Sequence, residues 1–232
     1  MNAQGGFYCN ALQAALINGY VDIAKCLLAN GADVNAQGGG YGNALQAVSH
    51  KGHVEIAKLP LEKGAKDVNT QGGEYGNALQ AASQSVNHVE IVKCLLEKGA
   101  DVNAQGGYYG NALQAASANG HVKIAKCLME KGADVNAQGG EYGNALQAAS
   151  QSVNHVEIVK CLLEKGADVN LQGGYYGNAL QAASANGHVE IAKCLMEKGV
   201  DVNAQGGEYG NALQAASGNG HVEIVKYLLN LQ

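Results

Sequence analysis

Residues 107–136 read GYYGNALQAASANGHVKIAKCLMEKGADVN and contain two short helical patterns separated by a turn. The segment 111–117 begins with Asn, a residue favoured before the first turn of a helix, and continues with small helix-forming residues. Asn119 and Gly120 then indicate a turn. The second pattern, over 121–131, has only one narrow polar stripe, so we expect a helix that is covered on several sides.

The residues after the second helical pattern indicate how it ends. Gly132 is predicted to end the helix in the left-handed conformation. The following segment, 138–143, holds three glycines in six residues, which permits a tight hairpin-like turn. A unit of this kind cannot bury its apolar surface alone, so we expect neighbouring copies to stack.

The unit recurs along the whole chain at a spacing of 33 or 34 residues. The string NALQA begins at Asn10, Asn43, Asn77, Asn111, Asn144, Asn178 and Asn211. A longer period is also present, because residues 70–136 and 137–203 differ at only four positions. The repeats predict an all-α solenoid of seven stacked helix-turn-helix pairs joined by β-hairpin-like loops.

These residues resemble the ankyrin repeat. The resemblance rests on GHVKIAKCLMEKGADVNA at 120–137 and GHVEIAKCLMEKGVDVNA at 187–204, and it extends over essentially the whole chain. It implies an ankyrin-repeat solenoid that binds proteins through its hairpin tips and inner helices, on a concave face. We expect a single domain over 1–232, with repeats at about 1–34, 35–68, 69–102, 103–135, 136–169, 170–202 and 203–232.

The chain departs from the family pattern in a consistent way. The family's Thr-Pro-Leu-His signature is replaced by Asn-Ala-Leu-Gln, as at 144–147, and its hairpin becomes Gly-Gly-x-Tyr-Gly. This variant is similar to the highly alike ankyrin arrays of fungal NLR-like proteins. That resemblance implies a ligand-sensing array belonging to a larger signalling protein.

Composition and charge narrow the choice of partners. The formal net charge is −5, and all fifteen basic residues are lysine. Without arginine, which reads guanine edges and clamps phosphates, binding to nucleic acid or to an anionic membrane is not expected. No apolar run approaches the ~20 residues that cross a bilayer, and the first residues do not resemble a signal peptide. We therefore expect a cytoplasmic or nuclear protein that is not secreted.

Two residue types that could indicate a chemical site recur once per repeat. Five of the six cysteines occupy equivalent positions, at Cys26, Cys94, Cys127, Cys161 and Cys194. Stacked repeats hold such positions roughly 8–10 Å apart, too far for a disulfide, so we expect buried free thiols. A histidine begins most second helices, at His53, His88, His121, His155, His188 and His221. Because no base–nucleophile pair or ligand cluster accompanies it, we expect no catalysis, metal or cofactor.

The position at the predicted fingertip of the hairpin varies while its neighbours do not. Along the chain it is Phe7, Gly40, Glu74, Tyr108, Glu141, Tyr175 and Glu208. Exposed loop residues on a rigid scaffold are favoured binding positions, so the five from Glu74 to Glu208 are predicted to contact a partner. The alternative is that they alternate only because the two-repeat block was duplicated.

Two further positions lie near the fingertip. A tyrosine follows it in every copy, at Tyr8, Tyr41, Tyr75, Tyr109, Tyr142, Tyr176 and Tyr209, and packing between hairpins is favoured over ligand contact. The turn between the two helices supplies four more candidate contact residues, Gln84, Asn119, Gln151 and Asn186. The longer turns at Gln84 and Gln151 are alternatively a tolerated surface insertion.

The sequence thus predicts a non-enzymatic protein–protein interaction module, either monomeric or weakly associated end to end. The alternative is a structural, self-assembling or engineered repeat scaffold without a natural ligand. One repeat is predicted to be locally weak, because Pro60 lies inside a second helix where other copies carry Leu, and Lys66 is an extra residue nearby.

Overall fold

The computed structural model describes residues 2, 5–6, 8–62, 67–86, 88–152 and 155–230. Phe7 and Lys66, singled out above, lie outside the described residues. The described residues form fourteen α-helices in seven pairs, as the repeat pattern predicts. The chain divides into two compact units, Met1–Ala112 and Leu113–Gln232, and the expectation of a single domain remains a prediction.

Each pair contains an inner helix, which follows a hairpin loop, and an outer helix. The inner helices are α1 (Ala11–Ile17), α3 (Ala44–Lys51), α5 (Ala78–Ser83), α7 (Ala112–Ala118), α9 (Ala145–Ser150), α11 (Ala179–Ala185) and α13 (Ala212–Gly218). The outer helices are α2 (Val21–Ala29), α4 (Val54–Glu62), α6 (Val89–Glu97), α8 (Val122–Glu130), α10 (Val156–Glu164), α12 (Val189–Glu197) and α14 (Val222–Leu229).

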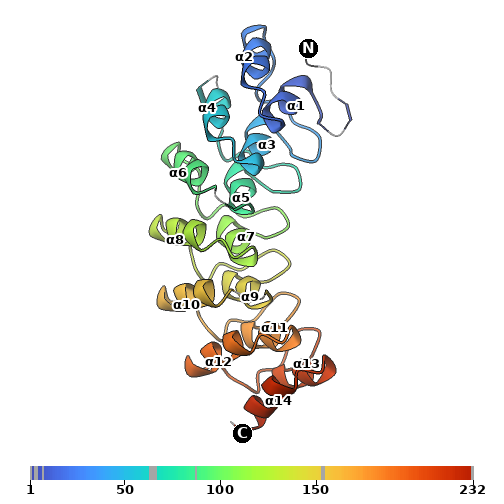
Figure 1. The fold of residues 1–232 in the computed structure, drawn as a ribbon, viewed down its shortest axis with the longest axis vertical. Helices are drawn as coiled ribbons and strands as arrows, with labels where there is room; N and C mark the ends of the chain where they lie inside the picture. The colour runs from blue at the N-terminus through green and yellow to red at the C-terminus, as the bar shows by residue number, and fades with distance from the viewer. Residues whose placement is uncertain are drawn as a thin grey trace. The chain divides into compact units, whose positions relative to one another are not determined.

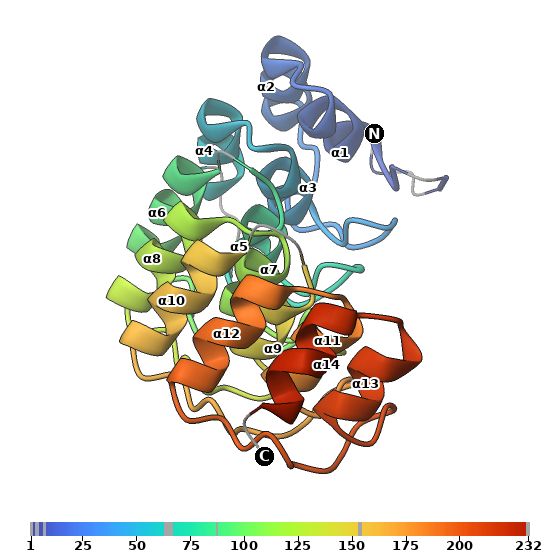
Figure 2. The ribbon, with the colours of Figure 1, turned by 60° about the horizontal axis from the view of Figure 1, so that its bottom comes forward.

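Within each unit, helices of the same kind stack on one another. Helix α3 contacts α1 and α5 in the first unit, and α11 contacts α9 and α13 in the second. Figure 1 shows α5 and α9 each lying between an outer partner and the hairpin loops. In Figure 2 the outer helices α8, α10 and α12 follow one another as a separate row of the second unit.

The inner helices begin at an asparagine cap and have a core of small residues. In α5 the side chain of Asn77 accepts a hydrogen bond from the backbone N–H of Gln80 at 2.9 Å, which caps the helix. Leu79, Ala81 and Ala82 are essentially inaccessible to solvent. Alanine at these positions allows neighbouring inner helices to approach closely, and this close stacking places successive hairpins side by side.

The outer helices bury an apolar surface and leave a polar stripe in solvent. In α6 the side chains of Ile91, Val92 and Leu95 are fully buried, whereas Glu90 and Lys93 are exposed and form an ion pair at 3.0 Å. An exposed pair of this kind contributes little to stability. The outer helices therefore depend on apolar burial against their neighbours, as the narrow polar stripe predicts.

The loops between pairs are hairpin-like and depend on glycine. In the described residues they form isolated antiparallel bridges rather than a sheet, as between Gly72 and Gly76 and between Gly106 and Gly110. Gly107 has a φ of +62°, and a Cβ placed on it would lie 2.7 Å from the backbone carbonyl carbon of Tyr75. A side chain at this position would therefore clash with the backbone of the preceding hairpin, which explains the glycine-rich connector.

A buried glutamine joins each inner helix before α13 to the hairpin that follows it. The side-chain nitrogen of Gln80 donates to the carbonyl oxygens of Ala104, Gly106 and Gly110 at 3.2, 3.0 and 3.0 Å. Its side-chain oxygen accepts from the backbone N–H of Asn77 at 2.8 Å. Gln46, Gln147 and Gln181 form equivalent bonds to the hairpins that follow them. This contact explains why Asn-Ala-Leu-Gln is repeated so strictly.

The cysteines follow the predicted pattern in part. Cys127, Cys161 and Cys194 are buried free thiols, and burial raises the pKa of the last two. Cys94 is half-buried, and Cys26 is exposed, contrary to expectation. Cys26 lies on α2, and no earlier outer helix covers that helix in the described part of the chain.

Pro60 does not shorten its helix. Helix α4 continues through Pro60 to Glu62 and has the same nine-residue length as α6. Residues 63–66, which would follow its last turn, lie outside the described residues, so the predicted weakness of this repeat stays a prediction. Pro60 lies in the last turn, where it removes a single backbone hydrogen bond, and its ring is buried at the position that Leu95 occupies in α6.

Replacing the buried glutamine is expected to weaken the stack. In Gln80→Leu the backbone N–H of Asn77 and the carbonyls of the next hairpin lose their buried partner, which should lower the free energy of unfolding by about 3 kcal/mol. Urea denaturation measures this change. The matched control is Gln105→Leu, because Gln105 is exposed and its loss should change stability by less than about 0.5 kcal/mol. Equal losses in both variants would contradict the assigned role.

The missing hydrogen bond at Pro60 should make α4 locally unstable. We expect its amides to exchange with solvent faster than those of α10, and Pro60→Leu to slow that exchange by restoring the bond, a gain of up to about 3 kcal/mol. Hydrogen exchange followed by mass spectrometry compares the two helices directly. Equal protection of α4 and α10 in the wild-type protein would show that the proline is tolerated without cost.

Candidate functional site

The fingertip residues lie on hairpins whose backbones are hydrogen-bonded to one another. In the first unit the N–H of Glu74 donates to the carbonyl of Gly40 at 3.0 Å. In the second unit the N–H of Tyr175 donates to the backbone carbonyl of Glu141, and the N–H of Glu208 donates to the backbone carbonyl of Tyr175, both at 3.1 Å. These bonds hold successive fingertips in register, so their side chains are presented from a fixed backbone.

The predicted fingertip contacts are accessible in the structure. Glu74, Glu141 and Glu208 are exposed, and Tyr108 and Tyr175 are 50% and 43% accessible to solvent. Because about half of each tyrosine is open to solvent, both are able to contact a partner without a rearrangement of the hairpin.

Two pairs of the tyrosines that follow the fingertips pack between hairpins, as the sequence predicts. The rings of Tyr176 and Tyr209 are stacked at 6.3 Å with an interplanar angle of 9°. Those of Tyr41 and Tyr75 lie 5.8 Å apart, and Tyr41 is buried. Tyr8 differs because it is exposed.

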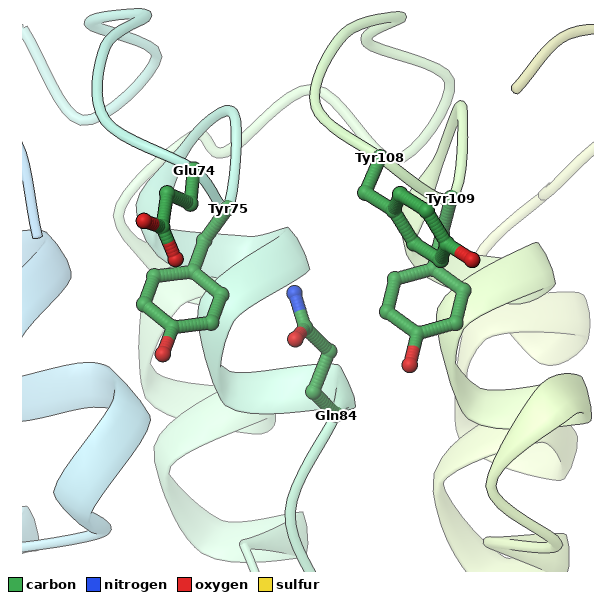
Figure 3. A pocket seen from close by; sticks show the side chains of 5 residues that line it. All are labelled: Glu74, Tyr75, Gln84, Tyr108 and Tyr109. Carbon is green, nitrogen blue, oxygen red and sulfur yellow. The ribbon is translucent and has the colours of Figure 1, made fainter. Parts of the chain in front are cut away.

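The four turn residues fall into two groups. The side-chain amides of Asn119 and Asn186 donate to the carbonyls of Ala115 and Ala182 at 2.8 and 2.9 Å, and so cap the ends of their own helices. Gln84 and Gln151 follow the shorter helices α5 and α9 and are half-buried. Gln84, unlike the two asparagines, directs its side chain toward the fingertips (Figure 3).

A pocket of about 440 Å³ brings three predicted contact residues together in the first unit. Figure 3 shows Glu74 on one hairpin, Tyr108 on the next, and the amide of Gln84 pointing between them from below. Two further residues, Tyr75 and Tyr109, complete the lining. The sequence favoured packing over ligand contact for these two tyrosines, and their position next to the variable fingertip was the available signal for a place in the pocket lining.

The same five residue types recur in the second unit, 67 residues later. They are Glu141, Tyr142, Gln151, Tyr175 and Tyr176. Of the nine candidate contact residues, the pocket brings together Glu74, Gln84 and Tyr108, whereas Asn119 and Asn186 serve as helix caps.

The tyrosines of these hairpins have altered acidity. The pKa of the Tyr75 hydroxyl is raised, first by burial and then by the neighbouring Tyr41 and Glu74. The pKa of Tyr175 is also raised, mainly because its hydroxyl donates a hydrogen bond to the carboxylate of Glu208. Both hydroxyls are thus protonated at neutral pH, and the pocket carries the charge of its glutamate only.

The histidines have a structural role. The Nε2 atoms of His188 and His221 lie 2.9 and 3.0 Å from the carbonyl oxygens of Gln151 and Ala185 in the preceding turn. Burial, and then the charges of His121 and His188, lower the pKa of His155. The described residues contain no group of three His, Cys, Asp or Glu side chains placed to hold a metal ion. Among them, no helix combines the length and apolar character needed to cross a membrane.

Comparison with known proteins agrees with the geometry. The chain matches the family described as ankyrin repeats (3 copies) over residues 11–106, 107–173 and 173–232. It is similar to the crystal structure of the human ASB11 ankyrin repeat domain, with 27% identity and a TM-score of 0.80, over 96% of this chain and 98% of that one. No curated protein sequence matches it. Because the family match extends over almost the entire length, the chain belongs to the ankyrin repeat family.

Proposed function

We propose that this chain is a non-enzymatic module that binds a protein partner through the concave face formed by its hairpin fingertips and inner helices. The observation that carries the proposal is the exposure of Tyr108 and Tyr175 at the fingertips, where the backbone of Tyr175 is hydrogen-bonded to both neighbouring hairpins. Half-exposed tyrosines on a rigid backbone provide contact area at a low entropic cost, and such residues dominate many protein interfaces. Ankyrin repeats generally bind proteins, which supports the same conclusion.

The glutamates of the fingertip row would select the partner. Glu74, Glu141 and Glu208 are exposed, and they add to a negative net charge. Opposite charges across an interface steer encounter and reject unsuitable partners more than they raise affinity. We therefore propose a partner with a basic surface. A finer proposal, supported by the resemblance to fungal NLR-like arrays, is that the module is the ligand-sensing part of a larger signalling protein.

A structural or self-assembling role is the alternative. It is favoured by exposed apolar side chains on α2 and α14, where Tyr20, Ile23 and Leu229 are 56%, 52% and 53% accessible. Apolar surfaces of this kind promote association when they are contiguous. Under this alternative, the molecular mass in solution would rise with protein concentration, which light scattering measures. A constant monomeric mass is expected for the binding module.

The binding proposal is tested by affinity capture from a cell extract with two matched triple variants. The first carries Tyr108→Ala, Tyr175→Ala and Glu141→Lys on the fingertips. The second carries Tyr20→Ala, Tyr227→Ala and Glu164→Lys on exposed outer positions. We expect the first variant to retain a captured protein at least about tenfold less well than the wild type, and the second to retain it fully.

Circular dichroism shows whether each variant keeps its helices before capture is compared. Equal capture by the wild-type protein and the folded fingertip variant would contradict the proposal and leave the glutamate–tyrosine alternation as a consequence of duplication. Loss of capture in the outer variant alone would show that the partner binds the outer helices instead.

A further inference from the structure

The fingertip pocket of the first unit has an unusual lining, with three aromatic rings, one amide and one carboxylate. The rings of Tyr108 and Tyr109 meet edge to face, with centroids 5.0 Å apart and an interplanar angle of 89°. In Figure 3 they form one wall, Tyr75 forms the opposite wall, and the carboxylate of Glu74 lies beside the Tyr75 ring. The pocket volume of about 440 Å³ is within the range of small-ligand sites.

The pocket is open because of the residue that follows α5. In the preceding repeat the equivalent position is His50, whose ring stacks on Tyr75 at 4.4 Å and lies 5.6 Å from Tyr41. In the second unit the equivalent position at the end of α11 is Ala185, and there Tyr176 and Tyr209 stack directly on each other. At Gln84 the side chain instead lies at the base of the space between Tyr75 and Tyr109 (Figure 3).

The charges around this pocket favour a cation. Its lining contains a carboxylate and no lysine. The ion pairs that the described residues form, such as Lys58–Glu55 and Lys93–Glu90, lie on outer helices and do not include Glu74. The faces of tyrosine rings attract a cation, and a carboxylate strengthens that attraction through charge-assisted hydrogen bonds. An anion would be repelled by Glu74, and an apolar group would leave its charge without a partner.

We propose that this pocket binds the cationic head of a lysine or arginine side chain from a basic segment of the partner, an inference that rests on the proposed protein-binding function. Glu74 pairs with the cation, the rings of Tyr75, Tyr108 and Tyr109 surround its methylene or guanidinium surface, and the Gln84 amide oxygen accepts a hydrogen bond from it.

The chain carries a second copy of the residues that line the pocket. The five lining residues recur with identical types at Glu141, Tyr142, Gln151, Tyr175 and Tyr176. Each of these lies within the second compact unit, as the first set lies within the first. We expect this second set to bind a cationic side chain as the first does.

The test follows the tyrosine rings by nuclear magnetic resonance in the full chain with ¹³C-labelled tyrosine. The probes are Nα-acetyl-lysine methylamide and Nα-acetyl-arginine methylamide, with the neutral Nα-acetyl-norleucine methylamide as their isosteric control. We expect both cationic probes to shift the ring signals of the two pockets at millimolar concentration, and the neutral probe to bind at least about tenfold more weakly. The dissociation constants of the cationic probes should rise with added salt.

Three matched substitutions assign the effect to the two carboxylates. Glu74→Gln should weaken binding to the first pocket by about fivefold at low salt and leave the second unchanged, and Glu141→Gln should do the reverse. Glu97→Gln removes an exposed charge from α6, outside the pocket, and should change neither. Each glutamine keeps the shape of the side chain and the backbone bonds of its hairpin, so folding is preserved.

Equal binding of the norleucine and lysine probes, or an unchanged dissociation constant in Glu74→Gln, would overturn the proposal, as would the absence of ring shifts with either cation. These outcomes are independent of the capture experiment. If a protein is captured through the fingertips but no cation binds, only the pocket inference fails. If the cations bind but no protein is captured, the proposed module function fails instead.

Discussion

The structure depends on the buried glutamine of the inner helices that precede α13. Gln80 connects two levels of structure, because it accepts a bond at the start of its own helix and donates to three carbonyls of the next hairpin. Those carbonyls face the protein interior and would otherwise lack a side-chain donor, which is costly where water is excluded. These hydrogen bonds thereby hold a short loop with little regular secondary structure to the inner helix of the preceding repeat.

Glycine and glutamine act together in this arrangement. Glycine at Gly107 allows one hairpin to approach the backbone of the preceding one, and glutamine then supplies the donor that keeps the two in place. The glycine-rich connector has high conformational entropy in the unfolded chain, and the loss of that entropy opposes folding. The benefit is a row of fingertips whose backbones are hydrogen-bonded, so that exposed residues such as Tyr175 occupy defined positions from which to contact a partner.

The residue at the end of the inner helix distinguishes packed tyrosines from a pocket. His50 fills the space between adjacent tyrosines, whereas Gln84 leaves a pocket with aromatic walls and an acidic rim. Histidine at this position accompanies packed tyrosines and glutamine accompanies a concave site, and α5 is also two residues shorter than the eight-residue α3. The near-identity of residues 70–136 and 137–203 then places the same set of side chains in both compact units.

The sequence by itself determined the solenoid of helix pairs, the boundaries of those helices to within a few residues, and the exposed row from Glu74 to Glu208, because each follows from periodicity and local preference. It also predicted the packing of the repeated tyrosine. It did not show that Asn119 and Asn186 cap their own helices, that Tyr75 and Tyr109 line a pocket, or that Pro60 is accommodated within α4. These outcomes depend on how adjacent repeats are spaced. A capping asparagine and a contact asparagine have the same local sequence, and only the distance between neighbouring hairpins decides whether two tyrosine rings meet or leave room for a ligand.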